Sequence, residues 1–494
     1  MPAPIAPPGY VHVCALKDTL THTRFQLSLR TLATPVTYHR LLLFRIAKPS
    51  EDEVEGADEL YCMEESCPHL GAPLSHAEIE VDDIEDTRAV VCPWHQYDFD
   101  LRDGTSSTGL KTCTYDVVVN GDGPNAGVWI EAPHVDGDHD WEMIEFRSVS
   151  EEFADPPPLT LEDLTLEVPE AAPSLSPEAP IVAATLPTDL PDTLLGFAHL
   201  VLATPEPGMK CALTREAVTR MRAGKLKSIR PSYAEIARAR KDGGLLEKPP
   251  RLQEAVRPWQ TSKRGRGGSE KSRIVMIHAL ANIEQYAIDL AWDIIARFAD
   301  TEVEGQRLPV EFFLDWAKVA EDEAKHYSLL ARRLHEMGSY FGAHSVHAGL
   351  WDSAMDTADS LLARIAVIHL VAEARGVDMN PLTLARLRTH GDTRSADILE
   401  IIHADEITHV TAGHRWFSWI CGKRNIDPIE QFRYEVRTNF HGDLKGPFNT
   451  ADRAKAGLTE EYYTDLKGHG VSRHAAYDGA GPDGGDTHMH PRLT

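Results

Sequence analysis

Two kinds of hydrophobic pattern divide the chain. Between residues 9 and 130, short runs rich in β-branched and aromatic residues alternate with turn residues and acidic stretches, which is typical of an all-β module. From residue 272 onward the apolar positions recur with helical spacing over much longer runs. Four such runs predict a helical bundle. They cover Ser272–Phe298, Phe312–Met337, Ser353–Ala374 and Ser395–Trp419.

A proline-rich segment separates the two patterns. Nine prolines occur between residues 156 and 191 among small and acidic residues, a composition that favours an extended connector. The last residues are rich in Gly, His and Asp, which predicts disorder. We therefore expect an all-β domain at 1–147, a linker at 148–191, an all-α domain at 192–467 and a disordered tail at 468–494.

Composition narrows the partners and the compartment. The chain has 494 residues, enough for two or three folding units, and 50 Lys and Arg against 76 Asp and Glu give a net charge of −26. That charge speaks against nucleic acid or an anionic membrane as the main partner. No uncharged apolar run is long enough to cross a bilayer, and the start lacks the order of a signal peptide. Seven sparse cysteines favour a reducing compartment, so we expect a cytoplasmic protein.

A first cluster of metal-binding residue types lies in the β-rich part. Cys67-Pro-His69 and Cys92-Pro-Trp-His95 are separated by 22 residues. Two Cys and two His also suit tetrahedral zinc. The paired Cys-Pro steps, Gly71 and the β-rich context favour an iron–sulfur cluster over zinc. The pattern resembles the Rieske signature over about residues 9 to 130. The resemblance implies a 2Fe-2S cluster with Cys67 and Cys92 on one iron and His69 and His95 on the other, where neutral imidazoles raise the reduction potential.

One difference from the respiratory Rieske proteins indicates which members of the family the module resembles. Those proteins carry an additional cysteine in each loop, whereas here the corresponding places hold Ala72 and either Gln96 or Tyr97. The module therefore resembles the Rieske ferredoxins and oxygenase-associated domains. The remaining cysteines are expected to be buried small hydrophobic residues. They are Cys14, Cys62, Cys113, Cys211 and Cys421.

A second constellation occurs twice in the helical part. The order is Glu, then Asp-Glu-x-x-His, and then the same again. On a helix the i, i+3 spacing places the Glu and the His of each motif on one face. Four carboxylates and two imidazoles can then converge on two metal ions, as in ferritin-like dimetal carboxylate proteins. The predicted ligands are Glu284, Glu323, His326, Glu373, Glu406 and His409.

The neighbouring sequence supports the assignment of some of these residues as metal ligands. Glu373 ends an apolar run that begins at Ile365, where a bare carboxylate is costly to bury and a metal would remove that cost. A competing pair, Glu400 and His403, lies six residues before Glu406 and His409, which rotates it by about 240°. We favour the later pair because Asp405 completes its motif. By resemblance to di-iron oxygenases, Asp322 and Asp405 are expected to hold ligand imidazoles from outside.

The helical part also resembles an uncharacterised ferritin-like family over about residues 190 to 465. That resemblance implies a ferritin-like four-helix bundle with these ligands, but it supplies no substrate. A relative in the same superfamily hydroxylates a modified base in tRNA, which keeps tRNA-base hydroxylation as an alternative. The residues that carry the resemblance are Glu373 to Asp378, Gly338, Tyr340, Trp351, Gly446 to Asn449, Arg453 and Ala456 to Leu458.

Together the two sites predict an oxygen-activating, non-haem di-iron monooxygenase that hydroxylates carbon or oxygenates nitrogen on a small organic substrate. Iron is the expected metal, with manganese as the alternative, and molecular oxygen is the second substrate. The single Gly-x-Gly-x-x-Gly, at Gly479, follows no strand, so a separate NAD(P)H-dependent reductase is expected. Two alternatives stay open: a ferroxidase or peroxide-scavenging protein, and a non-catalytic electron-transfer or iron-sensing protein. Association into a homo-oligomer is also open.

Overall fold

The computed structural model describes the chain in two compact units. Its described residues are 7–32, 36–46, 59–82, 87–94, 97–121, 123–134, 140–149, 185–241, 244–257, 260–261 and 269–469. One unit comprises Met1–Ala154 with Arg220–Lys225, and the other comprises Asp155–Thr219 with Leu226–Thr494. The expected linker at 148–191 and the expected tail at 468–494 lie mostly outside the described residues, although a short strand extends to His469.

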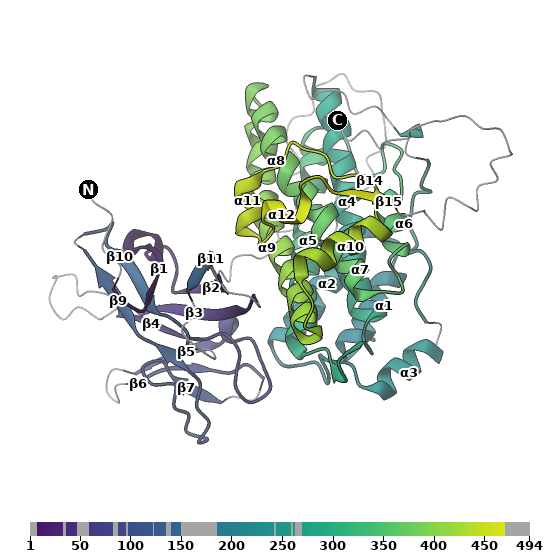
Figure 1. Cartoon of the computed structure of the whole chain (residues 1–494). Coiled ribbons are helices and arrows are strands. Elements are labelled where there is room, and N and C mark those ends of the chain that lie inside the picture. Colours follow the sequence, from purple (N-terminus) through teal and green to yellow (C-terminus); the bar gives the residue numbers. More distant parts are fainter. Residues whose placement is uncertain are drawn as a thin grey trace. The chain divides into compact units, whose positions relative to one another are not determined.

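The described residues of the first unit form three antiparallel sheets (Figure 1). Their strand orders are β1-β10-β9, β11-β2-β3-β4-β8 and β5-β6-β7. The strands are β1 (Tyr10–Ala15), β2 (Arg24–Thr31), β3 (Tyr38–Ile46), β4 (Glu59–Glu64), β5 (Glu78–Asp82), β6 (Thr87–Val91), β7 (Asp98–Asp100), β8 (Thr114–Tyr115), β9 (Val117–Asn120), β10 (Gly127–Glu131) and β11 (Trp141–Ser148). The short 3-10 helices η1 (Leu16–Thr19) and η2 (Leu74–His76) connect some of them.

Strand β3 separates two hydrophobic cores. Successive side chains of a strand point to opposite faces, so Leu41 and Leu43 enter one core while Leu42 and Phe44 enter the other. Both faces of this strand are therefore covered, which explains why its sequence is apolar without alternation. The second of these cores also contains Cys67 and Cys92.

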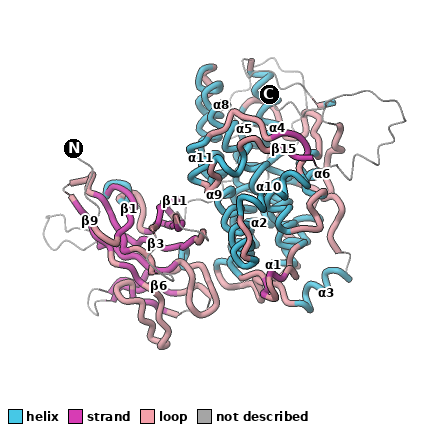
Figure 2. Tube along the Cα trace, viewed as in Figure 1, coloured by secondary structure: helices cyan, strands magenta, loops and turns pink. Residues whose placement is uncertain are grey.

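The second unit is mainly helical, with two short hairpins (Figure 2). Its helices are α1 (Leu194–Ala203), α2 (Pro207–Arg222), α3 (Tyr233–Lys241), α4 (Glu270–Arg297), α5 (Val310–Glu336), α6 (Gly349–Met355), α7 (Leu361–Arg364), η4 (Ile365–Ala372), α8 (Glu373–Thr389), α9 (Thr393–Arg424), α10 (Pro428–Asn439), α11 (Thr450–Lys455) and α12 (Glu460–Tyr463). The hairpin strands are β12 (Glu302–Val303), β13 (Gln306–Arg307), β14 (His441–Asp443) and β15 (Lys467–His469). None of the described helices is long and apolar enough to cross a lipid bilayer.

Local caps fix the ends of the long helices. The Ser269 side chain accepts a hydrogen bond from the backbone of Ser272 at the start of α4, and Asp392 does the same for Ser395 at the start of α9. Asn425 ends α9 in the left-handed conformation, with φ of 52°. Helices α4, α5 and α9 thus begin and end within a few residues of the predicted runs, apart from the longer C-terminal end of α9.

The third predicted helix, Ser353–Ala374, is wrong as a single element. The chain breaks between Met355 and Leu361, where Ser360 caps a new helix by accepting from the backbone of Ala363. That helix continues as the π-helix η4 and then as α8, which extends past Pro381 to Thr389. A proline inside a helix and a change in helical register are both hidden from a search for one regular period.

The helices that carry the predicted ligands pack together. Helix α4 lies along α5, α8 lies along α9, and α9 also contacts α5 and η4 (Figure 1). Helix α4 is buried on almost all of its faces over its second half, as expected for a central helix.

Four of the five cysteines outside the Rieske-like motif are buried as expected, but Cys113 is exposed, because it precedes the short strand β8 in a loop.

Candidate metal centres

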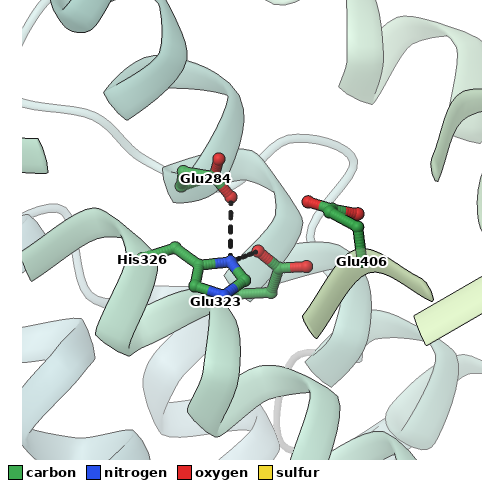
Figure 3. Close-up of side chains that lie close together, drawn as sticks. All are labelled: Glu284, Glu323, His326 and Glu406. Atoms are coloured by element: carbon green, nitrogen blue, oxygen red, sulfur yellow. Dashed lines mark hydrogen bonds and ion pairs between the residues drawn. The ribbon is translucent and has the colours of Figure 1, made fainter. Parts of the chain in front are cut away.

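All six predicted ligands of the helical unit come together. Their ligand atoms form two overlapping groups, and within each group the atoms lie within 4.8 Å of one another. Glu323 and Glu406 belong to both groups, which is where carboxylates that bridge two ions would lie. Figure 3 shows the first group, with the Glu284 carboxylate facing the His326 ring. The groups are Glu284, Glu323, His326 and Glu406, and Glu323, Glu373, Glu406 and His409.

Helical spacing turns both imidazoles toward the carboxylates. On α5, Nδ1 of His326 lies 3.2 Å from Oε2 of Glu323 and 3.5 Å from Oε2 of Glu284. On α9, Nδ1 of His409 lies 3.0 Å from Oε1 of Glu323 and 3.9 Å from Oε2 of Glu406. Each histidine thus presents the same ring nitrogen to the centre of the cluster.

The π-helix η4 places Glu373. In this segment the hydrogen bonds span five residues, and the backbone N–H of Glu373 donates to the carbonyl oxygen of Ile368. A π-turn shifts the register of the residues that follow it, and such turns often occur at functional sites. Glu373, only partly buried, consequently joins the group that contains His409.

The cluster fits metal ions because its polar atoms are otherwise unsatisfied. Oε1 of Glu323, Oε2 of Glu406 and Nδ1 of His409 are buried and have no hydrogen-bond partner among the described residues. Although Nδ1 of His409 and Oε1 of Glu323 are close, their geometry is not that of a hydrogen bond. Buried carboxylate oxygens and a ring nitrogen left unsatisfied in this way are costly, and a metal ion between them would remove that cost. Carboxylates with imidazoles suit first-row metal ions such as iron and manganese.

The electrostatics lead to the same conclusion. Burial, together with the neighbouring Glu323 carboxylate, raises the pKa of Glu284 to about 8 and that of Glu373 to about 7. Burial also raises the pKa of Glu406 well above its usual value. For Glu323, the opposing attraction of the two histidines outweighs burial and lowers the pKa. Without a cation, the folded site must therefore hold protons to limit repulsion between its carboxylates.

Outside the cluster, two aspartates hold the two histidines in a crossed pattern. Nε2 of His326 lies 2.9 Å from Oδ2 of Asp405, and Nε2 of His409 lies 3.4 Å from Oδ2 of Asp322. Each aspartate thus contacts the imidazole of the other motif. A carboxylate on the outer nitrogen fixes the ring orientation and favours the tautomer whose inner nitrogen can bind a metal.

A buried lysine joins the two aspartates. Nζ of Lys325 lies 2.5 Å from Oδ2 of Asp405 and 3.3 Å from Oδ1 of Asp322. Lys318 also contacts Asp322, with Nζ 2.5 Å from Oδ1. These ammonium groups offset the charge of the aspartates, and Lys325 links the supports of both histidines. This role of Lys325 was not predicted from the sequence, although the residue lies inside the first motif.

The competing pair on α9 lies elsewhere. Glu400 is exposed and forms an ion pair with Arg388, with 2.7 Å between Oε1 and Nη2. Nε2 of His403 lies 3.1 Å from Oδ2 of Asp452. Neither residue belongs to the two ligand groups. The six-residue offset along the helix accounts for this separation.

Metal binding to this cluster is expected to release protons. The folded pKa values of Glu284, Glu373 and His409, about 8, 7 and 9, all exceed their usual values, so these groups keep protons that a metal must displace. Because folding then binds protons, the stability of the metal-free helical unit falls as pH rises through these values. We expect the affinity of the site for manganese to rise from about pH 6 to about pH 9. Anaerobic titration with manganese measures the affinity, and a pH indicator in the same titration measures the protons released. Affinity independent of pH, without proton release, would contradict this electrostatic description.

The first unit brings together the cysteines of the other motif. Cys67 follows β4, Cys92 follows β6, and both are buried. The Cys92 thiol and burial raise the pKa of Cys67, while the backbone N–H groups of His69 and Leu70 bond to its sulfur and act in the opposite direction. Two facing buried thiols with backbone donors fit iron–sulfur ligands better than packed thiols.

Backbone hydrogen bonds close both cysteine loops. The N–H of Cys67 donates to the carbonyl oxygen of Ala72, and that of Cys92 donates to Tyr97, each at 2.8 Å. Gly71 has φ of 75°, which allows the chain to reverse beside Ala72. The half-buried His69 ring lies against Tyr97, with 4.8 Å between ring centroids. His95 lies outside the described residues.

Comparisons with known proteins identify both parts of the chain. Residues 13–113 match the Rieske [2Fe-2S] domain, which supports a 2Fe-2S cluster and implies iron–sulfur electron transfer. The fold and these cysteine loops therefore define a protein with an N-terminal Rieske domain and a C-terminal helical domain. Residues 203–464 match a family described as Protein of unknown function (DUF455). The chain belongs to this DUF455 family.

One curated relative and two solved structures illustrate these similarities. An uncharacterized protein of Haemophilus influenzae is 34% identical over 205 residues, which are 42% of this chain and 71% of the relative. A structure of reduced oxygenase with oxidized ferredoxin in carbazole 1,9a-dioxygenase is 18% identical, with a TM-score of 0.18, over 26% of this chain and 100% of that chain. A Mycobacterium tuberculosis protein, provisionally described as an NADH-dependent nitrite reductase small subunit, is 19% identical, with a TM-score of 0.19, over 26% and 96%.

Proposed function

We propose that this chain is an oxygen-activating, non-haem di-iron monooxygenase that receives electrons from its own Rieske cluster. One observation carries the proposal: two overlapping Glu and His ligand groups share Glu323 and Glu406 in a chain that also has a Rieske domain. The helices α4, α5, η4 with α8, and α9 would form a ferritin-like four-helix bundle around the metals. The proposed domain limits are residues 1–147 and 192–467.

The proposed ligands follow the two groups. One iron would be held by Glu284, Glu323, His326 and Glu406, and the other by Glu323, Glu373, Glu406 and His409. Asp322 and Asp405 would keep both imidazoles oriented from outside, as their contacts with the Nε2 atoms suggest. When bound, the pair of irons would supply the reductive activation of molecular oxygen. Manganese in place of one iron is the alternative for the same donor set.

The reaction balance explains why an electron carrier belongs in the chain. A monooxygenase converts substrate, oxygen, two electrons and two protons into hydroxylated product and water. A Rieske cluster carries one electron at a time, so two deliveries complete a turnover. Tethering the carrier raises its effective concentration at the acceptor. A separate NAD(P)H-dependent reductase would supply the cluster, and the substrate would be a small organic molecule.

The burial of the cluster assigns a task to the protein around it. Glu284, Glu323 and His326 are almost fully buried, so bulk water has little access to this side of the site. Glu373 is only partly buried, whereas the other five proposed ligands are buried, so solvent has more access to the site beside Glu373. Exclusion of water would limit side reactions that consume the delivered electrons without forming product.

Gas uptake in the purified holoprotein tests the proposed reaction. With a ferredoxin reductase and NADPH, a small-molecule extract is expected to stimulate oxygen uptake, and one atom of labelled oxygen is expected in a product. A deletion strain compared with its parent narrows the search for the substrate. Iron mineral formation or peroxide loss without an organic product would contradict the proposal in favour of a ferroxidase or peroxide scavenger. Redox changes of the cluster without any oxygen uptake would contradict it in favour of an electron carrier or iron sensor.

A further inference from the structure

A pair of buried aromatic side chains beside the ligand cluster has unsatisfied hydrogen-bonding groups. Both ring nitrogens of His369, on η4, and Nε1 of Trp316, on α5, are buried without a hydrogen-bond partner among the described residues. His369 is 2% exposed and Trp316 is fully buried. Their ring centroids are 4.1 Å apart, with 47° between the planes. Leaving three polar atoms unpaired in one place is costly, and each such group in a native protein calls for a partner.

The pair lies in the layer of side chains next to the ligands. His369 precedes Glu373 by four residues, about one turn of the π-helix, and Trp316 precedes Glu323 by seven residues of α5, roughly 10 Å along the axis. On α9 the corresponding residue is Gly413, where an added Cβ would lie 2.7 Å from the carbonyl oxygen of His369. The close approach of these backbones fixes where η4 presents its histidine. The ligand groups themselves do not include His369.

We infer that His369 and Trp316 form a subsite that binds an uncharged hydrogen-bonding group of the substrate, such as a hydroxyl, one helical turn from the metals. This inference rests on the proposed function, since it assigns a role in holding the substrate of that reaction. A neutral imidazole provides one donor and one acceptor, and the indole provides a second donor. A hydroxyl group can use two of these groups, donating to the acceptor nitrogen of the imidazole and accepting from the indole N–H, because the two nitrogens of one imidazole ring point in different directions.

The surroundings favour an uncharged group over an ion. Burial, with the nearby positive charge of Arg364, lowers the pKa of His369 to about 3, so the ring is neutral. Arg364 already donates to Asp293, to Thr357 and to the carbonyl oxygen of Ala354. A cationic group placed here would be repelled by Arg364, and an anionic group would lose its hydration while Arg364 is already engaged with Asp293, so both kinds of ion are disfavoured.

Phenol and toluene are suitable probes because toluene has a methyl group in the place of the hydroxyl group of phenol. In the metal-loaded, oxidised holoprotein we expect phenol to bind roughly ten-fold more tightly than toluene, the usual value of one well-formed hydrogen bond. His369→Leu is expected to abolish this preference while the metal content of the bundle stays unchanged. Trp316→Phe, which removes only the indole donor, is expected to reduce the preference. Calorimetric titration gives all of these affinities.

Trp416→Phe is the matched control. Trp416 is also a buried indole of the helical unit, but its Nε1 already donates to Oδ2 of Asp315 at 2.8 Å. This variant should keep the preference for phenol even if it is less stable. An unchanged preference in His369→Leu would overturn the inference and assign the unpaired atoms to an ordered water. Loss of bundle metal in His369→Leu would overturn the inference and indicate that His369 is a metal ligand. The absence of saturable phenol binding to the wild type would also overturn the inference.

The titration does not depend on turnover, so it separates this inference from the proposed function. A holoprotein that shows the His369-dependent preference but never takes up oxygen would retain the subsite and contradict the monooxygenase. The opposite result, substrate-dependent oxygen uptake without any effect of His369 on phenol binding, would retain the monooxygenase and contradict the subsite.

Discussion

Replacing Glu323 with glutamine is expected to empty both metal positions of the helical unit. Its two carboxylate oxygens lie near both histidines, and it belongs to both ligand groups, so one amide would weaken two sites at once. We expect the bundle metal content to fall roughly ten-fold or more, a loss at least as large as that from removing a residue that merely supports a ligand. Metal analysis of the purified variant, with helix content from circular dichroism, measures this.

Glu400→Gln is the matched control for Glu323→Gln. Glu400 begins the competing Glu-x-x-His sequence, but it is exposed and pairs with Arg388. Its replacement is expected to leave both metals in place, since surface ion pairs contribute little. Normal metal content in Glu323→Gln, or equal loss in the two variants, would show that the ligand assignment is wrong.

The second large effect is expected in the Rieske domain. Cys92→Ser should remove the visible absorption and the paramagnetic signal of the cluster, because a hydroxyl group is a poor substitute for an iron-bound thiolate. The metal content of the helical unit should be unchanged, because the proposed ligands are all on α4, α5, α8 and α9. Acid-labile sulfide and iron, determined on the same sample, measure both sites.

Cys14→Ser serves as the control in the same unit. Cys14 is buried in the core on the other face of β3, away from the core that holds Cys67 and Cys92. This variant is expected to retain the cluster, although a polar group in a core lowers stability. Stoichiometric zinc without sulfide in the wild type would contradict the iron–sulfur assignment altogether.

Much of the fold could be predicted because local signals agree with tertiary packing. Helices α4, α5 and α9 combine long apolar periodicity with caps such as Ser269 and Asp392, so their positions follow from the sequence. The segment from Ser353 to Thr389 could not be predicted in this way. Its break, its π-turn and the helical Pro381 interrupt the regular helical period on which the prediction relied.

The candidate ligands could be predicted for a similar reason. Four carboxylates and two histidines at helical spacing carry their own geometry, and burial of a carboxylate such as Glu284 has a cost that a metal ion can remove. The crossed contacts of Asp322 and Asp405 could not be foreseen, because they depend on the register between α5 and α9. The pairing of Trp316 with His369 depends in the same way on how η4 packs against α5.

The central claim is that electrons of the Rieske cluster reach the metals of the helical bundle. The most direct measurement is the rate at which the chemically reduced cluster is reoxidised after rapid mixing with oxygen, followed by its visible absorption. We expect fast reoxidation in the wild type and reoxidation slower by roughly an order of magnitude or more in Glu323→Gln, because tethering to loaded bundle metals is what accelerates the transfer. Equal rates in the two proteins, with the cluster intact in both, would contradict the claim.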